Sequence, residues 1–200
     1  EMFPLINRDR ENPAELFQVW LNLPARSKMA DPYFTMYWRE QLLRRVETDA
    51  NGRSTEIVVV AGDYEGVQGQ EPPPDSWASH KDARVQIWTV EMSAGAQWEL
   101  PAAAAGLNRV LYFHDGETLE LEGRTIAPNH AIQLRADQAH QLRASEGKGC
   151  SLLLLEGRPI GEPVAQHGPF VMNTRQELQQ AFQDYQRDEF GGWSWKQDDP

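Results

Sequence analysis

Short apolar runs, each bounded by turn-forming residues, are the feature that most limits the folds open to this 200-residue chain. Runs rich in β-branched and aromatic side chains recur between glycine, proline and Asn/Asp turn signals. This spacing favours a barrel or a sandwich over alternating strand and helix units, so the predicted fold class is all-β. We predict strands at 55–61, 83–92, 109–113, 118–122, 131–134, 141–144 and 150–155.

One helix is predicted after these strands. Thr174 and Glu177 have the spacing of a capping box, in which each side chain bonds the other residue's backbone N–H. Apolar residues then follow at helical intervals, namely Leu178, Ala181, Phe182 and Tyr185. Gly191 and Gly192 are expected to end the helix.

The first part of the chain has a different pattern. Residues 15–23 alternate with a period of two and have large apolar groups on both faces, which predicts a strand buried on both sides and ended by Pro24. Residues 25–53 are polar and charged, and we interpret them as a connection between domains. Within this connection, residues 38–46 fit either a short helix or an extended arm.

Charge and cysteine content exclude several classes of function. Acidic residues exceed basic ones by 30 − 19 = 11, which disfavours direct binding to nucleic acid or to an anionic membrane surface. No apolar stretch is long enough to cross a membrane. Cys150 is the only cysteine and lies in an apolar strand pattern, so we predict a buried thiol and a cytoplasmic location.

Two segments resemble the pirin family of two-domain cupin proteins. The run Gln166-His167-Gly168-Pro169-Phe170-Val171-Met172-Asn173-Thr174 is similar to the family's C-terminal signature, and the run from Glu15 to Pro24 is similar to its crossing strand. The resemblance implies a cupin barrel (a double-stranded β-helix or jelly roll) with a C-terminal helix. It further implies four parts: the end of an N-terminal cupin barrel at 1–24, the connection at 25–53, the C-terminal barrel at 54–165, and the signature, helix and tail at 166–200.

The second barrel was tested against the spacing of cupin metal motifs. Counted from Gly95, the two His positions of the first motif fall on Pro101 and Ala103 and the Glu position on Asn108, and the second motif places His140 at its ligand position. Proline and alanine have no donor side chain, and one imidazole cannot hold a divalent ion against hydration. We therefore expect a metal-free C-terminal barrel in which His140 is a hydrogen-bonded histidine at a barrel mouth.

The resemblance places the metal elsewhere. Pirins carry it in the N-terminal barrel, and the family's ligand pattern puts Glu1 at the fourth ligand position, with three histidines upstream of this sequence. The implied cofactor of the intact protein is Fe(II) or another divalent transition metal, and the implied activity is that of a quercetin 2,3-dioxygenase-like oxygenase acting on a flavonol-like molecule.

Two further interpretations stay open at this point. The protein could instead be a non-enzymatic regulatory or protein-binding module, for which Trp193 and Trp195 are the best contact candidates, although packing against the barrel is the simpler role for both. Alternatively, the second barrel could serve to close the first, with residues 15–23 contributing to the upstream half of the same protein and exposed in this chain alone.

Four histidines outside the template have simpler expected roles. We expect His114 in a turn, His80 and His130 in solvated positions, and His167 held by hydrogen bonds within the signature run.

Overall fold

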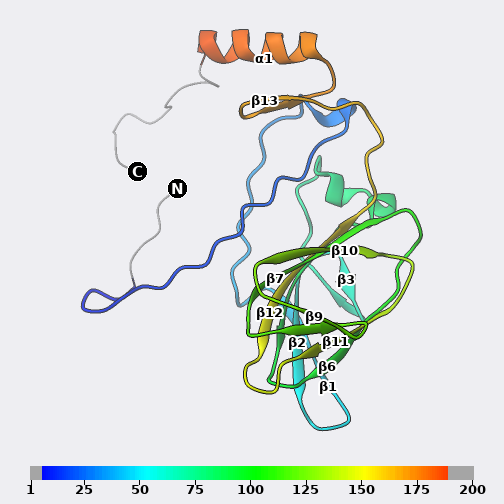
Figure 1. Ribbon diagram of the computed structural model, residues 1–200. Helices are drawn as coiled ribbons and strands as arrows, with labels where there is room; N and C mark the ends of the chain where they lie inside the picture. Colours follow the sequence, from blue (N-terminus) through cyan, green and yellow to red (C-terminus); the bar gives the residue numbers. More distant parts are fainter. Residues whose placement is uncertain (1–5, 189–200) are drawn as a thin grey trace.

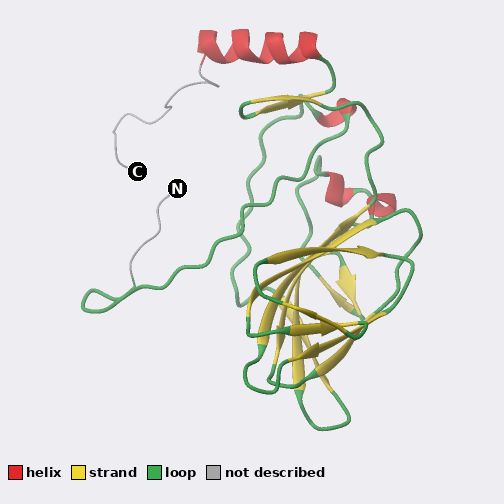
Figure 2. Cartoon of the chain, viewed as in Figure 1, coloured by secondary structure: helices red, strands yellow, loops and turns green. Residues whose placement is uncertain are grey.

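The computed structural model describes residues 6–188, and its body is a barrel of two antiparallel sheets (Figures 1 and 2). The six-stranded sheet has the order β1-β2-β5-β12-β7-β10, and the four-stranded sheet has the order β6-β11-β8-β9. The first contains β1 (Leu43–Thr48), β2 (Ser54–Ala61), β5 (Gln86–Met92), β12 (Cys150–Gly157), β7 (Asn108–Asp115) and β10 (His130–Arg135). The second contains β6 (Gln97–Leu100), β11 (His140–Ala144), β8 (Leu119–Leu121) and β9 (Arg124–Ile126).

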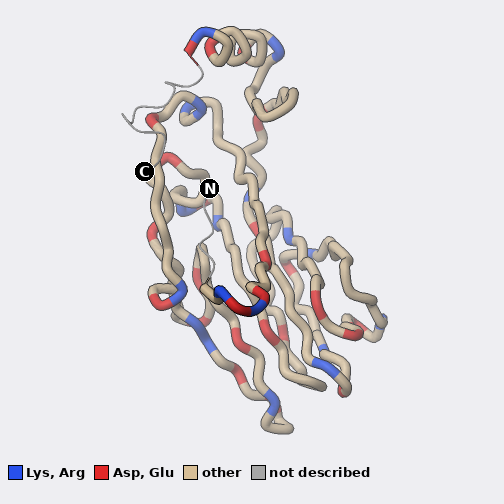
Figure 3. Tube along the Cα trace, turned by 90° about the vertical axis from the view of Figure 1, so that its left-hand side faces the viewer, with Lys and Arg blue, Asp and Glu red and all other residues tan. Residues whose placement is uncertain are grey.

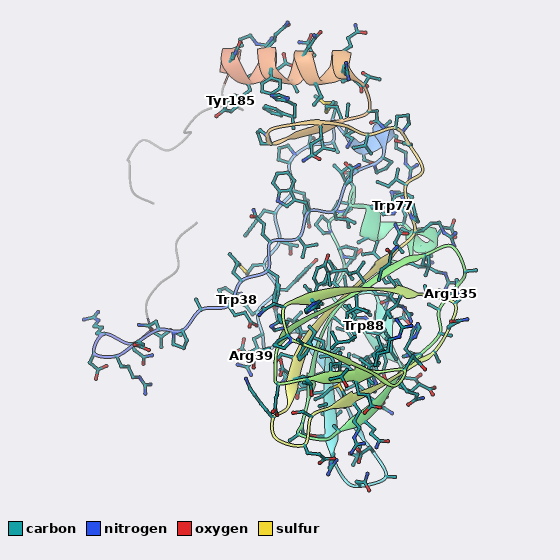
Figure 4. All side chains as sticks on the ribbon, in the orientation of Figure 1. Trp38, Arg39, Trp77, Trp88, Arg135 and Tyr185 are labelled. Atoms are coloured by element: carbon teal, nitrogen blue, oxygen red, sulfur yellow. The ribbon has the colours of Figure 1, made fainter. Side chains whose placement is uncertain are left out.

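The core lies between the two sheets. Successive side chains of a strand point to opposite faces, so every second residue enters the barrel. In β12, Leu152 and Leu154 are fully buried, and in β7 Leu111 and Phe113 are their counterparts. Trp88 lies among the barrel strands (Figure 4). The barrel interior is therefore filled by apolar side chains.

The end of β7 depends on a glycine. Gly116 has a φ of 145°, and a Cβ at this position would come within 2.9 Å of both the Phe113 ring and the Cβ of Cys150. Cys150 itself is buried, as predicted, and burial raises the pKa of its thiol to about 12.

The all-β prediction with one C-terminal helix is confirmed, and each predicted strand corresponds to an observed one. The largest difference is at 83–92, where the strand begins only at Gln86, because a 3₁₀ turn (Lys81–Ala83) and Arg84 in the left-handed region precede it. The pattern also missed several short strands of two to four residues: β6, β9, β3 (Asp63–Tyr64), β4 (Val67–Gln68), β13 (Ala165–His167) and β14 (Phe170–Met172).

The segment interpreted as a connection contributes a strand to the barrel. Residues 38–46 are neither a short helix nor an extended arm throughout, because they contain a turn followed by the start of β1. Strand β1 pairs antiparallel with β2 along its whole length. Its residues are mostly exposed, and it is the edge of the six-stranded sheet. A polar edge strand is easily mistaken for a loop in the sequence, because it pairs on one side only and its side chains stay mostly exposed.

Residues 15–38, which we call the arm, run outside the barrel in extended and irregular conformation, apart from a 3₁₀ turn (Ala25–Ser27) (Figure 1). Residues 15–23 are mostly exposed, as expected for this chain alone, but they do not form the predicted strand. No strand is assigned there, and Leu16 and Trp20 are largely exposed. The alternation is present, but within the described residues no strand pairs with it.

A small lobe made of β13, β14 and α1 (Arg175–Asp188) lies beyond the arm and away from the barrel (Figure 1). The capping box is confirmed: the Thr174 hydroxyl accepts from the Glu177 N–H at 3.2 Å, and the Glu177 carboxylate accepts from the Thr174 N–H at 2.7 Å. Glu162 joins the lobe to the arm, because its carboxylate accepts from the Ala25 N–H and from the Asn173 amide.

None of the helices that the structure describes is long and apolar enough to span a membrane. The predicted helix stop at Gly191 and Gly192, and the two tryptophans of the tail, lie outside the described residues.

Candidate functional site

The four template positions gather at one end of the barrel, although they come from three different segments. Pro101 directly follows β6, whose last residue Leu100 is paired with His140 at the start of β11. Asn108 begins β7 and is paired with Arg135, the last residue of β10. Ala103, in the loop between β6 and β7, donates its N–H to the Ala136 carbonyl at 2.7 Å. These contacts bring the four template positions together at one end of the barrel.

The inward-facing positions at this end differ from those that spacing assigned. Asn108 is exposed and lines the outer face of the sheet together with Val110 and Tyr112. The residue of β7 that points inward here is Arg109, in phase with Leu111 and Phe113. The template position at Asn108 is therefore off by one residue, since the irregular loop between β6 and β7 does not preserve the two-residue phase.

His140 is buried and already engaged. Its Nε2 lies 2.9 Å from the carbonyl oxygen of Arg135, and its Nδ1 lies 3.6 Å from Oε1 of Glu122. Because a carbonyl only accepts, the hydrogen of the neutral ring is on Nε2 in this bond. The imidazole thus connects β11 to the end of β10.

A buried ion pair fills the inward space beside these residues. Arg109 and Glu156 are opposite one another on β7 and β12, and their side chains are 2% and 3% exposed. The Arg109 Nε lies 2.5 Å from Glu156 Oε2, and another guanidinium nitrogen donates to the Pro101 carbonyl at 2.9 Å. Burial raises the pKa of the Glu156 carboxyl, and the guanidinium opposes this rise.

Neither partner of this pair was predicted from the sequence, although each is a charged residue in the inward phase of its strand. Arg109 stands in the inward phase of a strand otherwise filled by Leu111 and Phe113, and Glu156 stands in phase with Leu152 and Leu154. A charged side chain at a core-facing position is rarely buried without a partner. Two such positions in neighbouring strands predict a pair.

The residues at this barrel end do not fit a divalent metal. One imidazole is bonded to a backbone carbonyl, and the one inward carboxylate is bonded to a guanidinium. Across residues 6–188, no group of three or more His, Cys, Asp or Glu side chains is arranged to hold a metal ion. Glu1, the ligand that the family pattern implies, lies outside the described residues.

Two of the remaining histidines face the arm. His114 belongs to β7, so its prediction as a turn residue is wrong: the strand continues to Asp115, two residues beyond the predicted end at Phe113. Its Nδ1 lies 3.4 Å from Glu15 Oε2, and its ring meets Phe17 edge to face at 4.8 Å. His80 lies beside the Arg26 guanidinium, with 3.1 Å between Nε2 and the nearest nitrogen.

The other two have local partners. The Nδ1 of His130 lies 2.9 Å from the Ala127 carbonyl oxygen on the exposed side of β10. His167 was expected to act through hydrogen bonds, and what the structure gives it is an edge-to-face contact with Phe182 of α1 at 5.4 Å.

A shallow apolar groove of about 300 Å³ lies on the outer face of the six-stranded sheet, where the arm crosses it. Val19, Trp20 and Leu21 of the arm form one side, and Val110 and Tyr112 of β7 belong to the other. Trp20 stays 61% exposed, so the arm covers this face only in part.

Charge on the barrel is mixed rather than concentrated. Figure 3 shows basic and acidic residues interleaved along the barrel strands. Many of them form exposed pairs across strands or turns, such as Arg44 with Glu56 and Lys148 with Asp115. The acidic excess therefore does not form a binding site for a divalent cation among the described residues.

Comparisons with known proteins agree with the fold. The model of the pirin C-terminal cupin domain matches residues 87–191. A Pseudomonas aeruginosa protein, provisionally named a quercetin 2,3-dioxygenase, is 33% identical over 172 residues, which are 84% of this chain and 56% of that protein. A pirin-like protein of Caulobacter vibrioides is 32% identical over 87% of this chain and 58% of its own length.

A solved structure gives the same result at the level of the fold. A quercetin 2,3-dioxygenase from Acinetobacter baumannii matches with a TM-score of 0.70 and 23% identity, over 85% of this chain and 55% of that one. The barrel is therefore a cupin barrel, as the resemblance implied. The chain spans little more than half the length of these relatives.

Proposed function

The chain belongs to the pirin family, and we propose that the intact protein is a metal-dependent oxygenase similar to quercetin 2,3-dioxygenases, with its metal in an N-terminal cupin barrel and none in the barrel described here. The observation that carries this proposal is the donor set at the barrel end, where Arg109 and Glu156 take the inward space. The similarity to quercetin 2,3-dioxygenase-like proteins supports a metal cofactor, and residues 6–188 contain no group of side chains that would hold it.

In this proposal the metal is Fe(II) or another divalent transition ion, and a flavonol-like molecule is the substrate. Glu1 would be one ligand, by resemblance, beside three histidines further upstream. The metal would supply open coordination positions for its reactants. A cytoplasmic location also belongs to the proposal, and the buried thiol of Cys150 in an otherwise cysteine-free chain favours it.

The part played by this chain is to support the barrel that holds the metal. The arm presents large side chains to solvent, among them Phe34, which is 80% exposed, and Trp38, which lies on the arm outside the barrel (Figure 4). Exposed apolar patches of this kind mark contact surfaces. We infer that the arm contacts the N-terminal barrel, because the relatives continue well beyond the matched length.

Metal analysis and oxygen uptake with quercetin, made on the intact protein and on this 200-residue chain, test the proposal. We expect about one transition-metal ion per intact polypeptide, oxygen uptake that a chelator abolishes and Fe(II) restores, and neither property in the chain alone. Two matched variants of the intact protein sharpen the test: Glu1→Gln should lose metal and turnover, and His140→Gln should keep both. An intact protein full of metal but without turnover would contradict the oxygenase, and loss of metal on His140→Gln would contradict the location of the metal.

A further inference from the structure

We propose that Arg109 and Glu156 are a built-in substitute for a metal in this barrel: a permanent cation and its carboxylate that join the two sheets at the end where the ligand template falls. The inference concerns the described barrel alone, so it holds whatever the intact protein catalyses.

The geometry of the link supports this proposal. Arg109 and Glu156 lie opposite one another on β7 and β12, which belong to the six-stranded sheet. The same guanidinium donates to the carbonyl of Pro101, which directly follows β6 of the four-stranded sheet. A planar guanidinium has five N–H donors in fixed directions, so one side chain can serve both sheets at once. A metal held by ligands from facing strands would make the same connection.

The pair also lies beside the positions of the ligand template. The Pro101 carbonyl belongs to a template His position, and Arg109 is the neighbour of Asn108 at the template Glu position. His140, the template position of the second motif, starts β11 and is paired with Leu100, one residue before Pro101. The pair is therefore at the end of the barrel where a cupin would hold its ion, and not in an unrelated part of the core.

The charges of the pair disfavour a metal ion at this barrel end. A guanidinium is a cation with no acceptor atom, and both partners are almost completely buried. Water screens buried charges poorly, so an added cation at this end would be repelled by Arg109 and would have to compete with it for the Glu156 carboxylate. The carboxylate is already bonded and is not free to bind an added ion. The arrangement both replaces the link that a metal would make and excludes the metal.

Single and paired substitutions test the link in the 200-residue chain. Arg109→Met leaves the Glu156 carboxylate buried without a partner, and we expect the Tm to fall by about 10 °C. The double variant Arg109→Met/Glu156→Met removes both charges and should recover most of that loss, because no buried charge remains unpaired. Arg109→Lys keeps the positive charge but cannot donate to Glu156 and to the Pro101 carbonyl with the fixed geometry of a guanidinium, so its Tm should fall between those of wild type and Arg109→Met. Arg44→Met breaks the exposed pair with Glu56 on the same sheet and is the matched control, with an expected shift below about 2 °C.

The wild-type chain provides a second readout that does not depend on a variant folding. In ¹⁵N NMR the Arg109 Nε–H should exchange with solvent on the order of a thousandfold more slowly than that of the exposed Arg135. Added Mn²⁺ or Ni²⁺ should leave the Tm unchanged. Wild-type stability in Arg109→Met, exchange of Arg109 as fast as that of Arg135, or a rise in Tm of several degrees on adding either ion would each overturn the proposal.

Discussion

The barrel and the arm contain the same kinds of large apolar residue and place them in opposite environments. Phe113 of β7 is completely buried between the two sheets, and Phe34 of the arm is 80% exposed. The barrel closes on itself, so its apolar residues find partners within the described chain. The arm has the composition of a buried segment, but no surface within the described residues encloses it. Composition thus reports what a segment can bury, and the surrounding chain decides whether it does so here.

The most forceful way to break this comparison is to make the same substitution in both regions. Phe113→Ala removes a fully buried ring between the sheets and should cost about 3–5 kcal/mol of unfolding free energy, measured by urea denaturation. Phe34→Ala is the matched control and should change that free energy by no more than about 0.5 kcal/mol. Equal effects at the two positions would mean that the arm is packed in solution, contrary to the structure.

The cysteine of the barrel sharpens the comparison by its rate of reaction. Because burial raises the pKa of Cys150 to about 12, little thiolate is present at neutral pH, and the side chain is also sealed from reagents. We expect a thiol reagent to react with wild type at least about a hundredfold more slowly than with a Met36→Cys variant made in a Cys150→Ser background. Met36 is an exposed residue of the arm. Similar rates would show that the barrel opens readily.

Removing the cap of α1 should lower the local stability of the lobe and leave the stability of the barrel unchanged. Thr174→Ala removes the hydroxyl that caps the Glu177 N–H, which should cost α1 about 1 kcal/mol. Amide hydrogen exchange in α1 should speed up accordingly, and exchange in β7 and β12 should not change. Thr174→Ser keeps the acceptor and is the control. A drop in protection throughout the barrel would mean that lobe and barrel unfold as one unit.

The smallest expected effect lies at the barrel surface and depends on pH. The Asp49 carboxylate accepts from the backbone N–H groups of Asn51, Arg53 and Gln97, and these bonds lower its pKa, that of Arg53 first. An acid with a lowered folded-state pKa stabilises the fold above its unfolded pKa, and this contribution is lost as pH falls through the folded value.

Asp49→Asn should therefore lower the Tm slightly at neutral pH, with the two melting curves converging in acid below about pH 4. Asp75→Asn, in an exposed loop, is the control. A difference that persists unchanged at low pH would contradict this origin of the stabilisation.

Much of the barrel could be predicted because its strands alternate cleanly. The predicted strands 55–61 and 150–155 carry mainly apolar side chains in the inward phase, and both appear as strands with small shifts at their ends. Strand β1 was missed because it is an edge strand of charged and exposed residues, so its apolar signal is weak. The short strands β6 and β9 have too few residues for a period to be recognised.

The candidate site was predictable in place but not in phase. The positions counted from Gly95 lie at one barrel end in the structure, because turns and strand pairing fix which segments meet there. The count placed Asn108 at an inward-facing ligand position, whereas the structure has Arg109 facing inward there. The irregular backbone of the loop between β6 and β7 shifts the side-chain phase by one residue. A one-residue slip exchanges the two faces of a strand. Only three-dimensional structure could resolve that choice.

We propose that the Arg109 guanidinium occupies the inward space at the barrel end where the cupin ligand template falls. A crystal of the chain grown with excess Ni²⁺, with diffraction recorded at the nickel absorption edge, tests it most directly. We predict no anomalous peak inside the barrel and continuous density between Arg109 and both Glu156 and the Pro101 carbonyl. A stoichiometric peak coordinated by His140 or Glu156, with the guanidinium turned away, would contradict the claim.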